Sequence, residues 1–436
     1  MAAANRPNRR EFIAAGAAAT AGLGFMDGSV FAAPKQAERE KLPVAAIVTT
    51  YGKRKHADVI ITKIMEGWNQ DGGEGPALKV AGLYTDQVAK NDISRELAEK
   101  HGVPIFKTIE EAITLGTGKV QVAGVLSIGE HGEYPFTPDT NQHMYPRRRF
   151  FDEIVAALRK GGKIVPVFND KHLAYKWEDA KHMYDTAQKM NIPLLAGSSL
   201  PMAWRVPPLT LPMGFELTEA MSTGVGGLES YGFHALETLQ TMVERRKGGE
   251  TGVKSVQAVQ GEGIVEAEKA GRWSRDLLKS AAATAASVAK PPRVRKNKKD
   301  TETKDHSGLG ENAVVYLIEY LDGLKAAVAM RTNATSEFTF ACRKKDGKVE
   351  ATWIELHDDA PDLHFAHLLK AIEHTVHTGK PAYPVERTLL TTGMLDALLH
   401  SLADNSKRIE TPHLAIRYEP VEWPFAEGRP PARKAK

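Results

Sequence analysis

The sequence predicts an α/β fold: a doubly wound parallel sheet in the first half, followed by an α+β domain with an open antiparallel sheet. Two observations predict it. From 43 to 197, short apolar runs alternate with helix-length segments that carry an apolar stripe. After 197, short β-candidates are joined by tight turns such as Asp322-Gly323. We therefore expect two domains, 43–197 and 198–423, in this chain of 436 residues.

The stretch from Phe151 to Gly197 shows the repeating unit of the first domain. It reads as a helix, an apolar run ending at Phe168, a polar turn that carries Lys171, a second helix and a second apolar run. Parallel strands need such a crossover helix, so this is a βαβ unit. The upstream apolar runs are continuous rather than alternating, as in a sheet buried on both faces. Strands are expected at 42–49, 78–85, 103–106, 120–128 and 163–168, with helices at 56–68, 93–101 and 109–115.

The second domain is expected to be built around an antiparallel sheet. It opens with a Pro-rich loop at 201–212, and two helices, 364–379 and 386–405, close it. A polar, basic insertion at 290–311 reads as a mobile loop, and the tail 424–436 as disordered. The remaining elements are strands at 216–224, 253–260, 313–321, 324–331, 337–343 and 349–356, and a helix at 234–246.

The N-terminus reads as a processing segment. Arg9-Arg10 and Phe12-Ile13 precede a weakly hydrophobic run rich in Ala and Gly, and Val30-Phe31-Ala32 offers small residues for cleavage. This pattern is typical of a twin-arginine signal, so residues 1–33 are predicted to direct export to the periplasm. The alternative is a disordered basic leader on a cytoplasmic protein. No segment reaches the ~18 apolar residues of a lasting membrane span, and a single cysteine, Cys342, excludes an intrachain disulfide.

Charge gives no argument for nucleic acid as a partner. The chain has 58 Lys and Arg against 54 Asp and Glu, a net charge of +4. The cations of the 290–311 insertion are not interleaved with aromatic residues, so a solvated loop is favoured over a nucleic-acid surface.

Polar residues follow two of the predicted strands at the edge where ligands of open α/β sheets bind. After the first strand comes Thr49-Thr50-Tyr51-Gly52-Lys53-Arg54-Lys55-His56, whose cations can meet the phosphates of a dinucleotide at a helix N-terminus. A solvated helix start is an equal alternative. Asp86, which ends the second strand, can accept hydrogen bonds from a ribose diol and favours NAD over NADP, unless cations such as Lys53 relax that preference. An acid at a strand end is also common by chance.

Two residues are candidates for catalysis. Lys171 beside a nicotinamide can stabilise a developing alkoxide and lower the pKa of a substrate hydroxyl. The alternative is a surface lysine in a turn. His234, at a helix start, can accept the proton of a substrate hydroxyl, and Glu237 lies on the same helix face. The alternative is a core histidine with its hydrogen bonds satisfied.

A metal centre is not expected. Five histidines invite one: His357, His364, His367, His374 and His377. On the late helix, however, the apolar stripe consists of Phe365, Leu368, Leu369, Ile372 and Val376. His367, His374 and His377 fall mostly on the opposite face, which reads as a solvated polar face rather than a ligand set.

These segments, in this order, resemble the Gfo/Idh/MocA family of nicotinamide-dependent oxidoreductases from about Pro43 to Val421. Asp86 and the segment 94–104 are similar to the family's second strand and helix. Asn169-Asp170-Lys171 stands where the family carries Glu-Lys-Pro, and Gly232–Glu237 resembles its Gly-Ser-His-x-x-Asp segment. The resemblance implies a Rossmann domain, Lys171 and His234 as catalytic residues, and cofactor contacts from Thr50, Gly52, Lys53, Asp86, Ser127 and His131.

The resemblance also implies NAD or NADP, tightly bound in some exported members, and a homo-oligomer joined through an exposed sheet face. The usual substrates are sugars or cyclitols. The chain departs from the family in four places. TTYGKRKH replaces the glycine fingerprint, and Asn169 and His172 stand around the lysine in place of Glu and Pro. Ser230 stands where an acid precedes the histidine, with Glu229 adjacent, and SIGEH replaces Thr-Pro-Asn.

The leading hypothesis is therefore an exported NAD(P)-dependent oxidoreductase that transfers hydride between the cofactor and a sugar or cyclitol hydroxyl. The departures support a second hypothesis, a carbohydrate- or ligand-binding protein on the same fold that has lost redox activity. A third hypothesis is a scaffold that engages an envelope component through the insertion 290–311.

Overall fold

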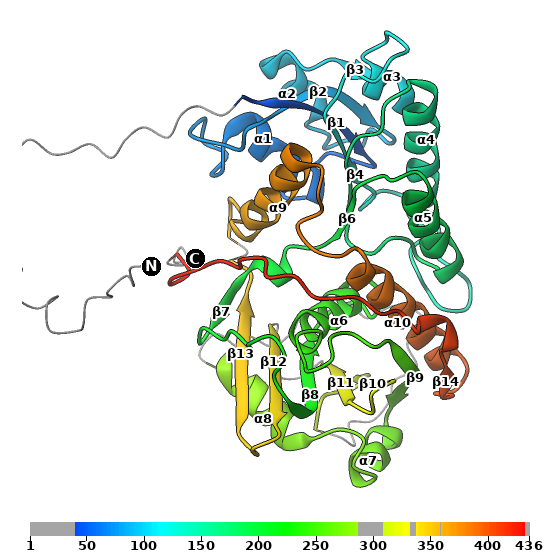
Figure 1. Cartoon of the computed structure of the whole chain (residues 1–436), viewed down its shortest axis with the longest axis vertical. Coiled ribbons are helices and arrows are strands. Elements are labelled where there is room, and N and C mark those ends of the chain that lie inside the picture. The colour runs from blue at the N-terminus through cyan, green and yellow to red at the C-terminus, as the bar shows by residue number, and fades with distance from the viewer. Residues whose placement is uncertain (1–39, 287–307, 332–336, 358, 432–436) are drawn as a thin grey trace, which may run out of the picture. The chain divides into compact units, whose positions relative to one another are not determined.

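The computed structural model describes residues 40–286, 308–331, 337–357 and 359–431 (Figure 1). The predicted export signal at 1–33, most of the insertion 290–311 and the last five residues of the predicted tail lie outside the described residues.

A six-stranded parallel sheet forms the first half, as predicted. Its strand order is β3-β2-β1-β4-β5-β6, so the chain starts mid-sheet, runs to one edge and returns past β1 to the other. The strands are β1 (Leu42–Val48), β2 (Leu78–Thr85), β3 (Ile105–Phe106), β4 (Gly124–Ile128), β5 (Val167–Asp170) and β6 (Leu194–Gly197). The helices between them are α2 (Ser94–His101), α3 (Ile109–Thr114), α4 (Arg147–Lys160) and α5 (Trp177–Lys189).

Both faces of this sheet are covered, which explains the continuous apolar runs. Along β1, Val44, Ala46 and Val48 pack into one core. Ala45 and Ile47, which point to the opposite face, pack into the core under α3, α4 and α5. A strand buried on both faces has no polar side to alternate with.

Several element bounds differ from those expected, among them β4, which begins at Gly124 rather than at 120. The helix expected at 56–68 is a π-helical turn, Asp58–Thr62, followed by the short α1 (Lys63–Glu66). Helix α4 begins at Arg147, four residues before Phe151. Strand β5 continues past Phe168, because Asn169 and Asp170 pair with Ala196 and Gly197 through backbone groups that do not depend on side-chain polarity.

The second sheet has eight strands in the order β14-β9-β10-β11-β8-β12-β13-β7. Its pairs are antiparallel except β8 with β11, which are parallel. The sequence missed β7 because it lies within the Pro-rich segment expected to be a loop; it pairs with β13. The strands are β7 (Trp204–Val206), β8 (Leu217–Gly224), β9 (Val253–Gln260), β10 (Val314–Tyr320), β11 (Lys325–Met330), β12 (Phe338–Lys344), β13 (Val349–Glu355) and β14 (Ile409–Glu410).

Helices cover both faces of the second sheet. On one face, α6 (Ser230–Val243) and α10 (Glu386–Ala403) pack into the larger core. On the other face, α7 (Glu262–Lys269) and α8 (Arg275–Thr284) pack with Leu309 over β8 to β12. Neither helix was predicted from the sequence. The sheet is open at its β14 and β7 edges, but the face expected to be exposed is covered in this chain.

Helix α9 (His364–Thr378) returns to the first sheet, although it follows the last long strand of the second. The apolar stripe predicted from its sequence, which includes Phe365, Leu369 and Ile372, packs against the β1 core. No helix of the described ranges has the length and apolar composition that a bilayer span requires.

Candidate active site

The candidate site lies at the carboxyl edge of the first sheet. Four adjacent strands end there in polar residues: β1 before Thr49-Thr50, β4 before Glu130-His131, β5 before Lys171 and β6 before Ser198. Parallel strands bring such termini to one edge, which is where ligands of doubly wound sheets bind.

Lys171 follows β5 directly and has a left-handed backbone, with φ of 62°. Its backbone N–H donates to the carbonyl of Gly197 at 3.0 Å. A lysine in this conformation is strained, and strain of this kind gathers at functional sites. The side chain is only 6% exposed, and Nζ donates to Glu130 Oε1 at 2.8 Å. Lys171 is thus a buried, ion-paired residue rather than a surface lysine.

Glu130 joins Lys171 to a second buried cation. Its Oε2 accepts a hydrogen bond from the guanidinium of Arg147 at 2.5 Å. Burial alone would raise the pKa of Glu130, but the two cations hold it well below its ordinary value. Burial alone would lower the pKa of Lys171, but Glu130 outweighs it and the pKa rises. At neutral pH the site therefore holds an ionised Glu130 between two protonated side chains.

The network continues through His172 to the second domain. Arg147 lies 3.1 Å from His172 Nε2, and the same nitrogen lies 3.0 Å from Glu229 Oε1. Burial, followed by the charge of Arg147, lowers the pKa of His172. Glu229, which precedes α6, thus contacts the site from the second domain.

His234 is part of a hydrogen-bonded relay. Its Nδ1 lies 3.2 Å from Ser198 Oγ, and Ser198 in turn makes a short hydrogen bond to Glu237 Oε2. The backbone N–H of Ser198 donates to Glu237 Oε1 at 3.0 Å. Burial raises the pKa of Glu237 to about 7. Burial and the charge of Lys171 lower the pKa of His234 well below its ordinary value, so its imidazole is neutral at pH 7.

The relay defines the tautomer of His234. When Ser198 Oγ donates its proton to Glu237, its oxygen can only accept from His234, which places the imidazole proton on Nδ1. Nε2 is then the free acceptor, and it makes no hydrogen bond with a residue of the described ranges. His234 is oriented as a base.

The loop after β1 contributes His56 to the same cluster. His56 Nδ1 lies 2.6 Å from Asp170 Oδ2, and its ring packs 5.4 Å from that of His131. Burial, followed by the charge of His56, lowers the pKa of His131 to about 3. The structure therefore brings His131, one of the predicted cofactor residues, into the network of Lys171 and His234.

Asp86 lies at the predicted strand end, and its carboxylate already accepts three hydrogen bonds. Its Oδ1 accepts from Tyr84 at 2.7 Å and from Arg149 at 2.6 Å, and its Oδ2 accepts from Tyr134 at 2.6 Å. A carboxylate accepts about four hydrogen bonds, so one position on Oδ2 remains for a ribose hydroxyl. The cation beside Asp86 is Arg149 rather than Lys53, whose side chain is exposed.

Acidic side chains of the chain itself hold the turn that precedes the helix after β1. Arg54 donates its backbone N–H to Asp58 Oδ2 at 2.7 Å, and its guanidinium forms a two-point ion pair with Asp362. Asp58 places a negative charge in the first turn, near the positive end of the helix where a pyrophosphate would bind. Gly52 is buried and bridges to Asp92.

Solved structures share the whole fold. GenD2 from gentamicin A biosynthesis, in complex with NAD, matches with a TM-score of 0.53 at 14% identity, covering 87% of this chain and 99% of that one. Apo scyllo-inositol dehydrogenase from Lactobacillus casei matches with a TM-score of 0.50 at 11% identity, covering 85% and 98%. This chain has the Gfo/Idh/MocA fold. No protein-family model and no curated protein matches the sequence.

Within this Gfo/Idh/MocA fold, the strand ends offer hydroxyl groups suited to a nicotinamide dinucleotide. Thr50 Oγ1, Thr85 Oγ1 and Ser127 Oγ are buried and lack a hydrogen-bond partner in the described part of the chain. They lie at the ends of three adjacent strands, β1, β2 and β4. Leaving a buried hydroxyl unpaired costs about 1–3 kcal/mol, and phosphate or ribose oxygens would satisfy these groups. The donor set fits the cofactor, although the glycine cradle is replaced.

The histidines of α9 form no ligand set: across the described ranges, no three His, Cys, Asp or Glu side chains are placed to hold a metal ion. His374 and His377 lie on the more exposed side of α9, whereas His364 is buried. Burial lowers the pKa of His364 to about 3.

Sequence reasoning missed five residues of the network: Glu130, Arg147, His172, Ser198 and Glu229 as a contact of His172. The rule that found Asp86 and Lys171 applies equally to Glu130 and Ser198, which follow β4 and β6. Arg147 carried a further signal, because a cation in the first turn of a helix opposes the helix dipole and needs a partner.

Proposed function

We propose that this protein is an NAD(P)-dependent oxidoreductase that transfers hydride between the cofactor and a hydroxyl-bearing carbon of a sugar or cyclitol. The observation that carries the proposal is the convergence of an oriented, neutral histidine and a buried, protonated lysine at the carboxyl edge of a doubly wound sheet. Two proteins of similar fold support a sugar or cyclitol as the substrate class: GenD2 from gentamicin A biosynthesis and scyllo-inositol dehydrogenase.

His234 accepts the proton of the substrate hydroxyl on Nε2. The imidazolium that forms donates from Nδ1 to Ser198, and Glu237 stabilises the charge through the Ser198 hydroxyl. Lys171 donates to the same substrate oxygen as negative charge develops on it. Glu130 uses one Nζ–H and no other residue of the described ranges accepts from Nζ, so two remain for the substrate.

NAD(P)⁺, when bound at the strand ends, supplies the hydride acceptor. Thr50, Ser127 and Thr85 would hold it by their unpaired hydroxyls, with His131 and Gly52 near the phosphates and Asp86 at the ribose. Arg149 beside Asp86 offsets the repulsion between that acid and a 2′-phosphate, so the acid alone does not exclude NADP.

The first test is the absorbance near the reduced-nicotinamide band of extensively desalted protein, before and after adding sugars and cyclitols, with mass analysis of what denaturation releases. We expect released NAD or NADP, or binding of added cofactor, and absorbance that changes with one substrate class. Protein that neither holds nor binds a nicotinamide refutes the proposal.

Variants then locate the chemistry. Lys171→Met should lower turnover by about 10²-fold or more, because it removes a group that stabilises the alkoxide. Lys181→Met, on the exposed face of α5, is the matched control and should leave turnover unchanged. Folded Lys171→Met protein with full turnover would remove Lys171 from the mechanism.

A second candidate function is a carbohydrate- or ligand-binding protein without redox activity. It is favoured by Asp58, whose carboxylate takes the helix N-terminus, and by the three donors already on Asp86. Calorimetric sugar binding in the absence of any nicotinamide binding would support it.

We also propose export by the twin-arginine route, from the N-terminal pattern. Arg9→Lys with Arg10→Lys should retain the protein in the cytoplasm of a bacterial host, as measured by fractionation. A homo-oligomer, if formed, would need a surface other than the second face of the eight-stranded sheet, since α7 and α8 cover it.

A further inference from the structure

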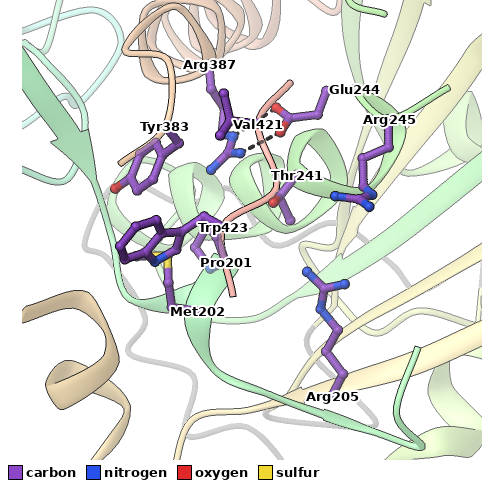
Figure 2. A pocket seen from close by; sticks show the side chains of 10 residues that line it. All are labelled: Pro201, Met202, Arg205, Thr241, Glu244, Arg245, Tyr383, Arg387, Val421 and Trp423. Carbon is purple, nitrogen blue, oxygen red and sulfur yellow. Dashed lines mark hydrogen bonds and ion pairs between the residues drawn. The ribbon is translucent and has the colours of Figure 1, made fainter. Parts of the chain in front are cut away.

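A second cationic site lies at the opposite end of α6 from His234. Residues from η2 (Leu200–Met202), β7, the end of α6, the start of α10 and the C-terminal segment line a pocket there (Figure 2). Ten residues separate His234 from Glu244, which is about 15 Å along a helix axis. The pocket is therefore separate from the candidate active site.

Three arginines reach this pocket: Arg205 from β7, Arg245 after α6 and Arg387 from the first turn of α10. Figure 2 shows the guanidinium groups of Arg205 and Arg245 pointing toward one another across it. Like charges that approach inside a protein repel strongly, because the surroundings screen them less than water does.

Two of the three arginines have a carboxylate partner. Arg387 forms a two-point ion pair with Glu244, and Tyr418 donates a further hydrogen bond to the same carboxylate at 2.7 Å. Arg245 donates to Glu422 at 2.6 Å, but the Glu422 side chain is 71% exposed and lies at the rim. The acids thus neutralise Arg387 and Arg245 and leave none for Arg205.

Arg205 is the unneutralised cation. It is 8% exposed, and its one hydrogen bond among the described residues runs from Nη1 to the carbonyl of Leu209 at 2.9 Å. No carboxylate of the described ranges lies within ion-pair distance, and its guanidinium stacks on Phe425 with 4.0 Å from Cζ to the ring centroid. Burial, followed by the charges of Arg245 and Arg387, lowers its pKa to about 9, so it stays protonated at neutral pH.

We infer that this pocket is a binding site for a small oxyanion, a phosphate or carboxylate group, held between the guanidinium groups of Arg205 and Arg245. A planar guanidinium presents two parallel N–H donors that match the oxygens of such a group, and a bound anion removes the repulsion between the two arginines. Thr241 adds a hydroxyl to the same wall. This site goes beyond the proposed oxidoreductase activity and does not depend on it.

The test is thermal unfolding of the full chain in phosphate, sulfate or acetate, with ionic strength held constant by chloride. Binding should raise Tm along a saturating curve, by about 2–5 °C at a hundredfold excess over Kd. A response to phosphate and sulfate indicates a phosphate-type ligand, and a response to acetate a carboxylate. A Tm that is the same in phosphate, sulfate, acetate and chloride at this constant ionic strength overturns the inference.

The Arg205→Met variant separates this site from any phosphate bound at the candidate active site. Removing an unpaired buried cation should raise Tm in chloride and abolish the part of the anion response that this pocket contributes. Arg408→Met, which changes an exposed arginine paired with Glu319, is the control and should keep the full response. An equal anion response in Arg205→Met and the unmodified protein would contradict the site.

If Arg205→Met fails to fold, Arg205→Lys keeps the charge but loses the planar fork. Titration calorimetry with inorganic phosphate should then show binding at least 10-fold weaker than in the unmodified protein. Unchanged affinity in Arg205→Lys and in Arg245→Gln would equally refute the inference.

Discussion

Replacing Glu130 by Gln tests the charge network that holds Lys171. The substitution keeps the shape of the side chain and removes the one charge that lies against both Arg147 and Lys171. It is expected to destabilise the protein strongly, because no other acid of the described ranges is in direct contact with the two cations that remain.

The magnitude follows from burial. The Arg147 side chain is fully buried and that of Lys171 nearly so, and removing one partner of a buried ion pair typically costs about 3–5 kcal/mol. Asp170 also acts on Lys171 and offsets part of this cost. We therefore expect about 3 kcal/mol, a large share of the 5–15 kcal/mol that stabilises a typical protein.

The assay is denaturant unfolding at pH 7, with Glu110→Gln as the matched control. Glu110 pairs with Lys160 at the same 2.8 Å, but the two side chains are 42% and 69% exposed, so its loss should cost less than about 1 kcal/mol. The double variant Glu130→Gln with Lys171→Met should recover part of the lost stability, because it removes one of the stranded cations.

An equal loss of unfolding free energy in Glu130→Gln and Glu110→Gln would refute the reasoning. So would a double variant that is less stable than Glu130→Gln by the full cost of a second, independent substitution.

Three further predictions follow from the relay and from Asp86. Ser198→Ala should lower turnover about 10²-fold with little change in KM, measured by steady-state kinetics, because His234 loses its link to Glu237. Burial raises the pKa of Glu237 from 4.5 to about 7, so between these pH values the folded protein keeps a proton that the unfolded chain releases. The free energy of unfolding therefore falls as pH rises through this range, by up to about 3 kcal/mol. Glu237→Gln should flatten this slope in unfolding measurements at pH 5 and pH 8. Arg149→Ala should weaken NADP binding about 10-fold relative to NAD in fluorescence titrations, since Asp86 would then face a 2′-phosphate without its cation.

The sequence by itself determined the class of both sheets. Continuous apolar runs such as 78–85 predicted buried parallel strands, and that strand has the predicted bounds. The spacing of apolar residues is a local, periodic signal in the sequence, so it also predicted the apolar stripe of α9 correctly. The strand-end rule placed Lys171 at the correct edge, although β5 extends two residues past the end of its apolar run.

Only the tertiary structure decided which charges meet. Glu130 and Lys171 are 41 residues apart, and Ser198 and Glu237 are 39 apart, so no spacing in the sequence relates them. Ion pairs of this kind form because strands from distant segments end at one edge of the sheet. A charge buried there loses its solvation by water, so it is stable only beside an opposite charge. The same reason explains Arg205: its sequence neighbours in a Pro-rich segment gave no sign that folding would bury it beside Arg245.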